Sequence, residues 1–142
     1  MTLLSQLLDL KGKDVHSVGP DAPVLDAIRT MAEKHVGALL VLEEGRLAGI
    51  ISERDYARKV VLMGRSSTNT PVRDIMTAEV LTIGPEDTVD DAMRLMTRHR
   101  IRHLPVVRGS KVMGVVSIGD LVKSVIEDQR HTIEDLQSYI HG

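Results

Sequence analysis

Aromatic residues are almost missing from the sequence: there is no Trp or Phe, and Tyr56 and Tyr139 are the only two Tyr. Because single-stranded nucleic acids are held largely by bases stacked on aromatic side chains, this composition argues against such a partner. The core must instead be aliphatic, built from Val, Ile, Leu, Ala and seven Met. With 142 residues, 42% of them hydrophobic, the chain can bury one core or two small units that share one.

Cysteine is absent as well, which excludes disulfides, thiolate metal sites and a Cys nucleophile. No stretch approaches the roughly 20 apolar residues needed to cross a bilayer. Residues 1–10 include Asp9 and lack the long apolar run of a secretory signal, so we expect a soluble, cytoplasmic protein without a membrane partner. Lys and Arg number 18 against 20 Asp and Glu, which argues against a chain that coats nucleic acid.

The most informative feature is an internal repeat at a constant offset of 65 residues, in a register that needs no gap. Ser-Val-Gly-Pro-Asp at 17–21 returns as Thr-Ile-Gly-Pro-Glu at 82–86. Gly-Ile-Ile-Ser, which ends at Ser52 and is followed by Asp55, returns as Gly-Val-Val-Ser before Asp120. The chain therefore contains two copies of one structural unit.

Each copy has the same expected order of elements, β-α-β-β-α. A short extended piece that ends at Gly-Pro (15–18 and 80–83) precedes an amphipathic helix with apolar residues at helical spacing. Two apolar runs then predict a buried hairpin, and Ser52 and Ser117 each open another helix. The four expected hairpin strands are residues 38–42, 47–51, 104–107 and 112–116. We expect an α/β (α+β) fold in which the tandem repeats pack about a pseudo-twofold axis, with terminal helices.

The sequence predicts five segments: an N-terminal helix or arm, the first repeat, a polar linker, the second repeat and a C-terminal helical extension. Their expected bounds are 1–13, 14–64, 65–78, 79–128 and 129–142. Apolar stripes mark both ends of the chain: Leu3, Leu7 and Leu10 at the front, and Val122, Ile126, Gln129, Ile133, Leu136 and Ile140 at the back. The last helix runs about two turns past the point where its counterpart stops. We therefore expect its stripe to form a homodimer contact, with packing on the chain's own core as the alternative.

The repeated Ser and Asp have two interpretations. A Ser at the N-cap with an acid three residues later is close to a capping box, which needs no ligand. The same geometry presents N–H groups and the positive end of the helix dipole to a phosphate, and a carboxylate suits vicinal ribose hydroxyls. The Gly of each motif also permits a close approach to the backbone. One copy alone would not separate the two interpretations, but the duplication favours a ligand site.

The second copy carries cations that the first lacks. Arg102 and His103 stand at the entry to the Leu-Pro-Val strand, where the first copy has Gly37 and Ala38. This difference favours phosphate binding in the second copy. His99 and His103 are spaced as i and i+4, but no acidic or Cys companion has ligand-like spacing, so no metal site is expected. No nucleophile–base pair is distinguishable either, so no catalytic residue is predicted.

The doubled Gly-x-x-Ser-x-x-Asp motif with its Leu-Pro-Val strand resembles the CBS (cystathionine β-synthase) domain, in the tandem pair called a Bateman module. The resemblance covers residues from about 14 to 128, and residues 51–59 and 102–106 look like the small two-CBS proteins of proteobacteria and plant organelles. It implies clefts between the repeats for AMP, ATP, NAD(H) or S-adenosylmethionine, with no required cofactor. In the first copy, Leu40 in place of Pro departs from the pattern.

The resemblance also implies two sets of ligand-binding residues. In the family, the motif Asp holds ribose, the motif Ser contacts phosphate, and apolar strand residues enclose the purine. The main adenylate site would comprise Ser117, Asp120, Arg102, His103, Val115, His16 and Val36. The second would comprise Ser52, Asp55, Ile50, Leu81 and Ile101.

We therefore expect a non-catalytic module that binds an adenine nucleotide and signals energy or redox state to a protein regulated in trans. Two binding alternatives remain: a dimerisation scaffold in which Ser and Asp only cap helices, and a sensor of S-adenosylmethionine. A nucleotide hydrolase is the enzymatic alternative, and it would need a base, a metal or a nucleophile beside the phosphates.

Overall fold

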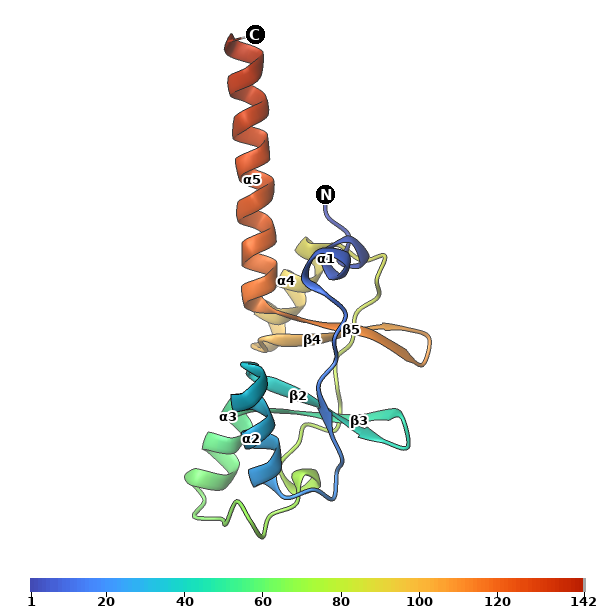
Figure 1. The fold of residues 1–142 in the computed structure, drawn as a ribbon, viewed down its shortest axis with the longest axis vertical. Helices are drawn as coiled ribbons and strands as arrows, with labels where there is room; N and C mark the ends of the chain where they lie inside the picture. The colour runs from blue at the N-terminus through green and yellow to red at the C-terminus, as the bar shows by residue number, and fades with distance from the viewer. Residues whose placement is uncertain (142) are drawn as a thin grey trace. The chain divides into compact units, whose positions relative to one another are not determined.

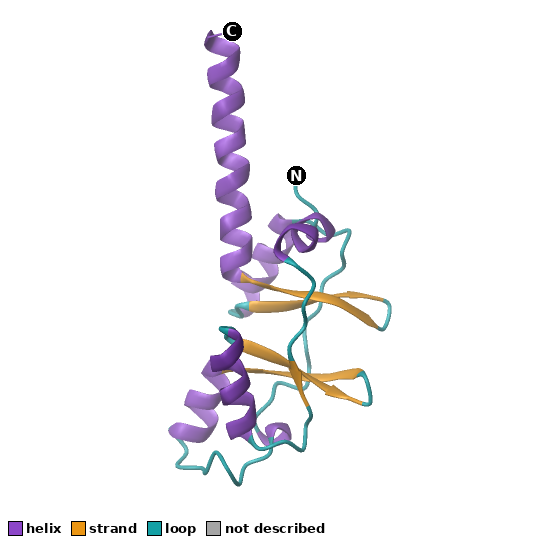
Figure 2. Cartoon of the chain, in the orientation of Figure 1, coloured by secondary structure: helices purple, strands orange, loops and turns teal. Residues whose placement is uncertain are grey.

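The structure is a computed structural model that describes residues 1–141, and these residues form two compact units (Figure 1, Figure 2). Unit 2 consists of residues 14–81 and contains the first repeat. Unit 1 combines residues 1–13 with the chain from Thr82 onward, and so contains the second repeat. The predicted α/β class and the terminal helices are confirmed, and the doubled order of elements is confirmed except for the first strand of the second repeat.

Unit 2 is built on an antiparallel hairpin, with a short strand added in parallel to one side. Its elements are β1 (Ser17–Val18), α2 (Val24–Lys34), β2 (Ala38–Glu43), β3 (Arg46–Ser52), α3 (Glu53–Tyr56), the π-helical η1 (Ala57–Val61) and the 3₁₀ helix η2 (Val72–Asp74). Unit 1 has the matching hairpin, joined by the N-terminal helix. Its elements are α1 (Leu4–Lys11), α4 (Val89–His99), β4 (His103–Arg108), β5 (Lys111–Ser117) and α5 (Ile118–His141).

Equivalent positions of the two repeats build the two cores. Each core takes two apolar residues and one Met from its first helix, and three more residues from its hairpin. The buried pairs, all related by 65 residues, are Val24 and Val89, Ala27 and Ala92, Met31 and Met96, Leu39 and Leu104, Val41 and Val106, and Ile51 and Val116. The repeat seen in the sequence is therefore a repeat of the core.

Each repeat is completed by the segment that precedes the other repeat in the chain. Residues 70–76 pack into unit 2, and residues 2–8 pack into unit 1 in the equivalent place. Matching backbone hydrogen bonds, each 2.9 Å long, run from the Val24 N–H to the Thr70 carbonyl and from the Val89 N–H to the Thr2 carbonyl. The buried apolar residues of the two segments are Val72 and Ile75, and Leu4, Leu7 and Leu8. The expected linker thus contributes to a core.

The motif glycines lie where these two segments cross the hairpins. A Cβ at Gly114 would stand 2.7 Å from the Leu8 Cδ2 atom. A Cβ at Gly49 would stand 2.7 Å from the Met76 Sδ atom and 2.9 Å from the Thr77 carbonyl oxygen. The close approach that glycine permits is therefore to the chain itself in both units, and it fixes how the completing segments pack.

The first strand forms in only one of the two repeats, which corrects the expectation of two. In unit 2, the Leu40 N–H donates to the His16 carbonyl, beside the β1–β2 pairing. In unit 1, Pro105 occupies the position of Leu40 and has no N–H to donate. Only an isolated bridge between Ile83 and Val106 remains there.

The two terminal stripes also differ from the sequence analysis. The expected N-terminal stripe is wrong, because the Leu10 side chain is 80% exposed, while Leu4, Leu7 and Leu8 form the buried face of α1. The helical extension at the C-terminus is longer than expected. The counterpart of α5 ends at Val61, which corresponds to Ile126, so α5 continues for about four turns beyond it.

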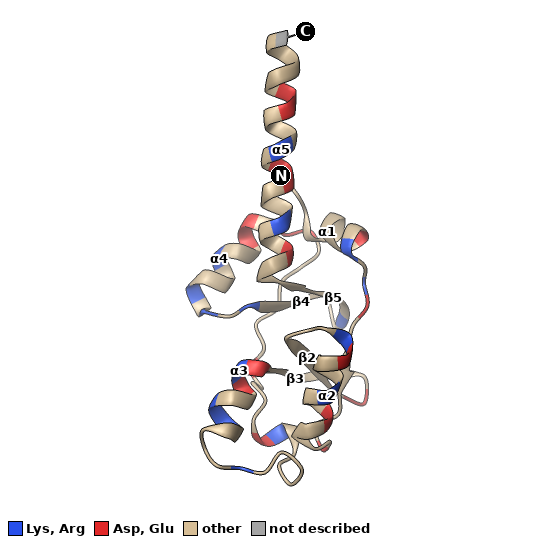
Figure 3. Ribbon diagram, turned by 60° about the vertical axis from the view of Figure 1, so that its left-hand side comes forward, with Lys and Arg blue, Asp and Glu red and all other residues tan. Residues whose placement is uncertain are grey.

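Helix α5 leaves the rest of unit 1 after its first turns and carries interspersed acidic and basic residues (Figure 1, Figure 3). Its apolar stripe is exposed: Val122, Ile126, Ile133, Leu136 and Ile140 all have between 42% and 73% of their surface accessible. Within residues 1–141, none of the helices combines the length and the apolar character needed to cross a bilayer.

Candidate ligand-binding site

The open end of the unit 1 hairpin brings four of the predicted residues together. In the antiparallel register, His103 at the start of β4 lies opposite Ser117 at the end of β5. The Ile118 N–H then donates to the Arg102 carbonyl at 2.8 Å, which ties the chain before β4 to the first residue of α5. Asp120 lies in the first turn of that helix. Arg102, His103 and the motif Ser and Asp therefore lie at one corner of unit 1.

Ser117 and Asp120 form the reciprocal hydrogen bonds of a capping box. The Ser117 N–H donates to the Asp120 Oδ2 atom at 2.8 Å, and the Asp120 N–H donates to the Ser117 Oγ atom at 3.2 Å. The structural role that we weighed against ligand binding is thus present. It also holds the carboxylate in one orientation at the N-terminal end of a 24-residue helix.

A lysine from the N-terminal helix, Lys11, forms a hydrogen bond to the Asp120 carboxylate. The Lys11 ammonium donates to the Asp120 Oδ2 atom and to the Val115 carbonyl, both at 2.8 Å. Partial burial raises the pKa of the Asp120 carboxyl, but the hydrogen bonds from Lys11 and from the Ser117 N–H outweigh it. The net effect lowers the Asp120 pKa below its ordinary value, so this corner holds a carboxylate anion at neutral pH.

The equivalent corner of unit 2 has the same cap but a different environment. Ser52 and Asp55 exchange backbone–side chain bonds of 3.0 and 3.2 Å, and the Ser52 hydroxyl also donates to Asp55 at 3.1 Å. The Glu53 N–H donates to the Gly37 carbonyl, as Ile118 does to Arg102 in the other unit. A neighbouring lysine, Lys59, lies 3.3 Å from the Asp55 carboxylate. Arg102 and His103 have no basic counterparts in this unit, because Gly37 and Ala38 stand at the equivalent positions.

The remaining predicted residues are divided between the units. Val115 lies on β5 opposite Pro105, two residues before Ser117, so it belongs to the unit 1 corner. Ile101, predicted for the second site, is also in unit 1, packed against its core. The predicted residues in unit 2 are His16, Val36, Ile50 and Leu81. Their roles in binding stay predictions.

Two lysines at these corners were missed by the sequence analysis. Lys59 follows Asp55 by four residues on one helical stretch, so the i,i+4 rule could have identified it. Lys11 is 109 residues away from Asp120 in the chain, and no local pattern links them. Only the packing of α1 on the second repeat brings them together.

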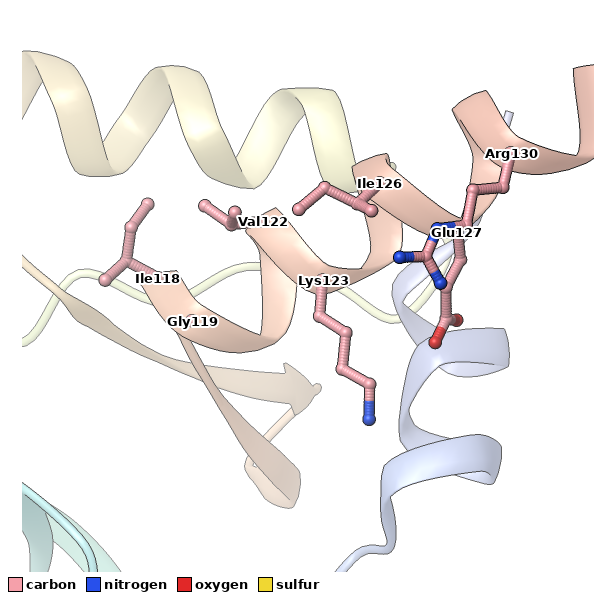
Figure 4. A pocket seen from close by; sticks show the side chains of 7 residues that line it. All are labelled: Ile118, Gly119, Val122, Lys123, Ile126, Glu127 and Arg130. Carbon is pink, nitrogen blue, oxygen red and sulfur yellow. The ribbon is translucent and has the colours of Figure 1, made fainter. Parts of the chain in front are cut away.

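A groove runs along the first turns of α5, beginning at the two residues between Ser117 and Asp120. Figure 4 shows Ile118, Val122 and Ile126 along one side of the helix, with Lys123 on another. The groove is lined as well by Gly119, Glu127 and Arg130. Among the described residues, no three acidic or His side chains gather in a way that could hold a metal ion.

The chain is similar to known proteins over nearly its whole length. The family model of the CBS domain matches twice, over residues 9–62 and 72–127. The CBS domain-containing protein CBSX3, mitochondrial, of Arabidopsis thaliana is 44% identical over 150 aligned positions, which cover 99% of this chain and 73% of the relative.

Solved structures agree with the sequence relatives. A protein with CBS domains from Burkholderia ambifaria MC40-6 is 53% identical, with a TM-score of 0.88 over 90% of this chain and 96% of its own. The CBS domain pair of protein MJ0100, solved in complex with 5′-methylthioadenosine and S-adenosyl-L-methionine, is 25% identical, with a TM-score of 0.78 over 87% of this chain and 99% of its own. The chain therefore belongs to the CBS-domain family and contains two CBS domains, as its doubled motif predicted.

Proposed function

We propose that this chain is a non-catalytic regulatory module that binds an adenine nucleotide and reports its level to a partner protein. The observation that carries the proposal is the corner of unit 1. There, a carboxylate anion, a helix N-terminus and two basic residues lie together at the end of one hairpin. These groups match the ribose hydroxyls and the phosphate of a nucleotide.

We assign the ribose to Asp120 and the phosphate to Ser117, Arg102 and His103. The purine would lie on the apolar side of β5 at Val115, with His16 and Val36 as its remaining predicted contacts. The complex of the MJ0100 domain pair with adenosine compounds supports an adenosine moiety in the ligand. For unit 2, we propose weaker or no binding at Ser52 and Asp55, with Ile50, Leu81 and Ile101 as the predicted apolar contacts.

S-adenosylmethionine is the second candidate ligand, and the MJ0100 complex favours it. Its sulfonium and ammonium groups are positive, and so is the Arg102 guanidinium, which precedes β4 at this corner. Cations beside cations cost free energy, and cations beside phosphate gain it. We therefore rank AMP, ATP and NAD(H) above S-adenosylmethionine.

The same chain would act as a homodimer through α5. Ile133 and Ile140 take the a positions of a heptad and Leu136 takes the d position, the combination that favours two parallel helices. A second copy offers the same exposed stripe, so the two would cover each other. The regulated protein would be a further partner, acting in trans. Cytoplasmic location stays a prediction, since the Arabidopsis relative is named as mitochondrial.

Mass spectrometry of gently purified protein, followed by calorimetry with AMP, ATP, NADH and S-adenosylmethionine, tests the proposal. We expect one or two adenylates for each chain, with no turnover of ATP or NAD. Saturation should stabilise the fold by mass action, about 2.7 kcal/mol at a hundredfold excess over Kd. If none of the four compounds binds, the dimerisation scaffold becomes the better interpretation. Turnover of ATP or NAD would favour the nucleotide hydrolase.

A further inference from the structure

We propose that Lys11 is a built-in competitor for the ligand at the unit 1 corner, and that binding releases the end of α1. The inference rests on the proposed function, because it names what the adenylate must displace. The Lys11 ammonium bonds the Asp120 carboxylate and the Val115 carbonyl, both at 2.8 Å. These are the ribose anchor and a backbone acceptor in the proposed purine subsite.

The hydrogen-bond capacity of Asp120 makes the competition direct. A carboxylate oxygen has two lone pairs, and the Asp120 Oδ2 atom already accepts bonds from the Ser117 N–H and from Lys11. A ribose that uses both carboxylate oxygens must therefore take the place of one of these donors. The Ser117 N–H is part of the helix cap, whereas Lys11 ends a flexible four-carbon stem. Lys11 is the donor that leaves.

The loss of this contact would act on the last turn of α1. This helix has only eight residues, a length that is marginal without tertiary support. Leu4, Leu7 and Leu8 anchor its first two turns in the core, but Leu10 is exposed. In the last turn, Lys11 is the residue that bonds to the second repeat.

The position of this turn in the chain gives the release a consequence. Unit 1 gives way to unit 2 between Lys13 and Asp14, two residues after Lys11. A ligand that displaces Lys11 therefore loosens one of the two peptides that connect the units, the other being at residues 81–82. In unit 2, the lysine at the motif carboxylate comes from the same helical stretch and also donates to the Ile75 carbonyl at 2.9 Å, so a ligand that takes only the Asp55 carboxylate would leave that bond in place. Ligand occupancy would be reported by α1 and by unit 1 alone.

Hydrogen exchange and calorimetry on the full chain test this device with three variants. Lys11→Met keeps the stem and removes the charge, and Lys11→Arg keeps the charge. Lys13→Met is the matched control, because its partner Asp9 is on the same helix end and both side chains are more than half exposed.

We expect Lys11→Met to bind AMP about two- to fivefold more tightly, the range set by an ion pair worth up to about 1 kcal/mol. Without ligand, the amides of residues 10–12 should exchange faster in this variant than in the wild type. AMP should increase the hydrogen-exchange rate of the same amides in the wild type, and it should cause no further increase in Lys11→Met. Lys13→Met should behave as the wild type, and Lys11→Arg should keep exchange slow.

Equal or weaker AMP binding by Lys11→Met would overturn the competition, because Lys11 would then be neutral or a ligand contact itself. Failure of the proposed function gives a different result: no adenylate would bind to any variant. In that case, hydrogen exchange in the ligand-free protein still tests whether Lys11 restrains the last turn of α1. Faster exchange of residues 10–12 in Lys11→Met alone supports it, and unchanged exchange in all variants overturns it.

Discussion

The two units have equivalent cores and the same capped motif. However, the lysine beside the motif carboxylate comes from a different part of the fold in each unit. In unit 1, Lys11 comes from α1, the segment that completes the repeat, and crosses to Asp120. In unit 2, Lys59 comes from the motif helix itself and donates to the Ile75 carbonyl of the completing segment at 2.9 Å. Both lysines therefore join the motif to the completing segment, but the carboxylate is bonded to a distant element only in unit 1.

The corners differ in charge and in helix length as well. Unit 1 has Arg102 and His103 ahead of its strand and a 24-residue helix behind its motif. In unit 2, the α-helix after the motif has four residues before it widens into η1. Because the effect of a helix N-terminus is confined to its first turn, the basic residues ahead of the strand, and not helix length, distinguish the two corners as proposed anion sites. Duplication has preserved the cores while the corners diverged.

Truncation after Gln129 removes the largest difference between the repeats, the extension of α5. We expect the dimer to be lost, since each fully buried Leu or Ile contributes roughly 1.5–3 kcal/mol and three are removed. Light scattering measures the change. The full-length variant Ile133→Gln should weaken the dimer too, whereas Glu134→Gln should not. A truncated dimer of unchanged thermal stability would show that the repeats themselves supply the interface.

Asp120→Ala and Asp55→Ala compare the two corners directly. Both variants lose a capping box, so the cost to the fold should be similar, about 1 kcal/mol. Asp120→Ala should also lose roughly 3 kcal/mol of adenylate binding, because two charge-assisted hydrogen bonds to ribose disappear. Asp55→Ala should affect only the weaker adenylate binding that we propose for unit 2. Calorimetry with AMP separates the two, and equal losses would contradict the unequal sites that we propose.

Gly49→Ala and Gly114→Ala compare the two completing segments. The Cβ at 114 meets only the side chain of Leu8, which can move, whereas the Cβ at 49 also meets the Thr77 backbone carbonyl. Overpacking of this kind costs about 1–3 kcal/mol, and we expect Gly49→Ala near the upper end and Gly114→Ala near the lower. Urea denaturation gives both values. A larger loss for Gly114→Ala would mean that α1 is the more rigid of the two segments.

The smallest expected effect is a pH dependence at the Lys11–Asp120 pair. The Asp120 pKa is depressed in the folded chain, so the stability that it contributes is present above the unfolded value of about 3.9. This stability is lost as the pH falls through the folded pKa. The difference between the wild type and Lys11→Met should be at most about 1 kcal/mol at pH 7 and should vanish toward pH 2. A difference that persists in acid would point to packing of the Lys11 stem instead.

The repeat made most of the fold predictable, because a constant offset aligns helices, hairpins and core positions without a gap. What it could not predict depends on contacts between distant segments. The packing position of α1 could not be predicted from the sequence. Residues 2–8 are structurally equivalent to residues 70–76, but their offset differs from the 65 residues that relate the two repeats. The missing strand in unit 1 follows from the single imino acid Pro105, whose effect was readable only once the Leu40 hydrogen bond was known.

The candidate site, like the fold, was predictable where it depends on local motifs and unpredictable where it depends on contacts between distant segments. Sequence identified Ser117, Asp120, Arg102 and His103, and the register of β4 with β5 brings them to one corner. Lys11 was beyond reach, because its partner is separated from it by most of the chain. Local motifs thus identify the groups that we propose for ligand binding, and tertiary packing brings Lys11 to the Asp120 carboxylate.

A crystal structure of the protein grown with AMP tests the central claim most directly. We predict ribose hydroxyls within hydrogen-bond distance of the Asp120 carboxylate, phosphate against Ser117, Arg102 and His103, and the Lys11 ammonium displaced from Asp120. The Asp55 corner should be empty or partly occupied. Ribose held at Asp55 instead, or AMP bound away from both motifs with the Lys11–Asp120 pair intact, would contradict the account.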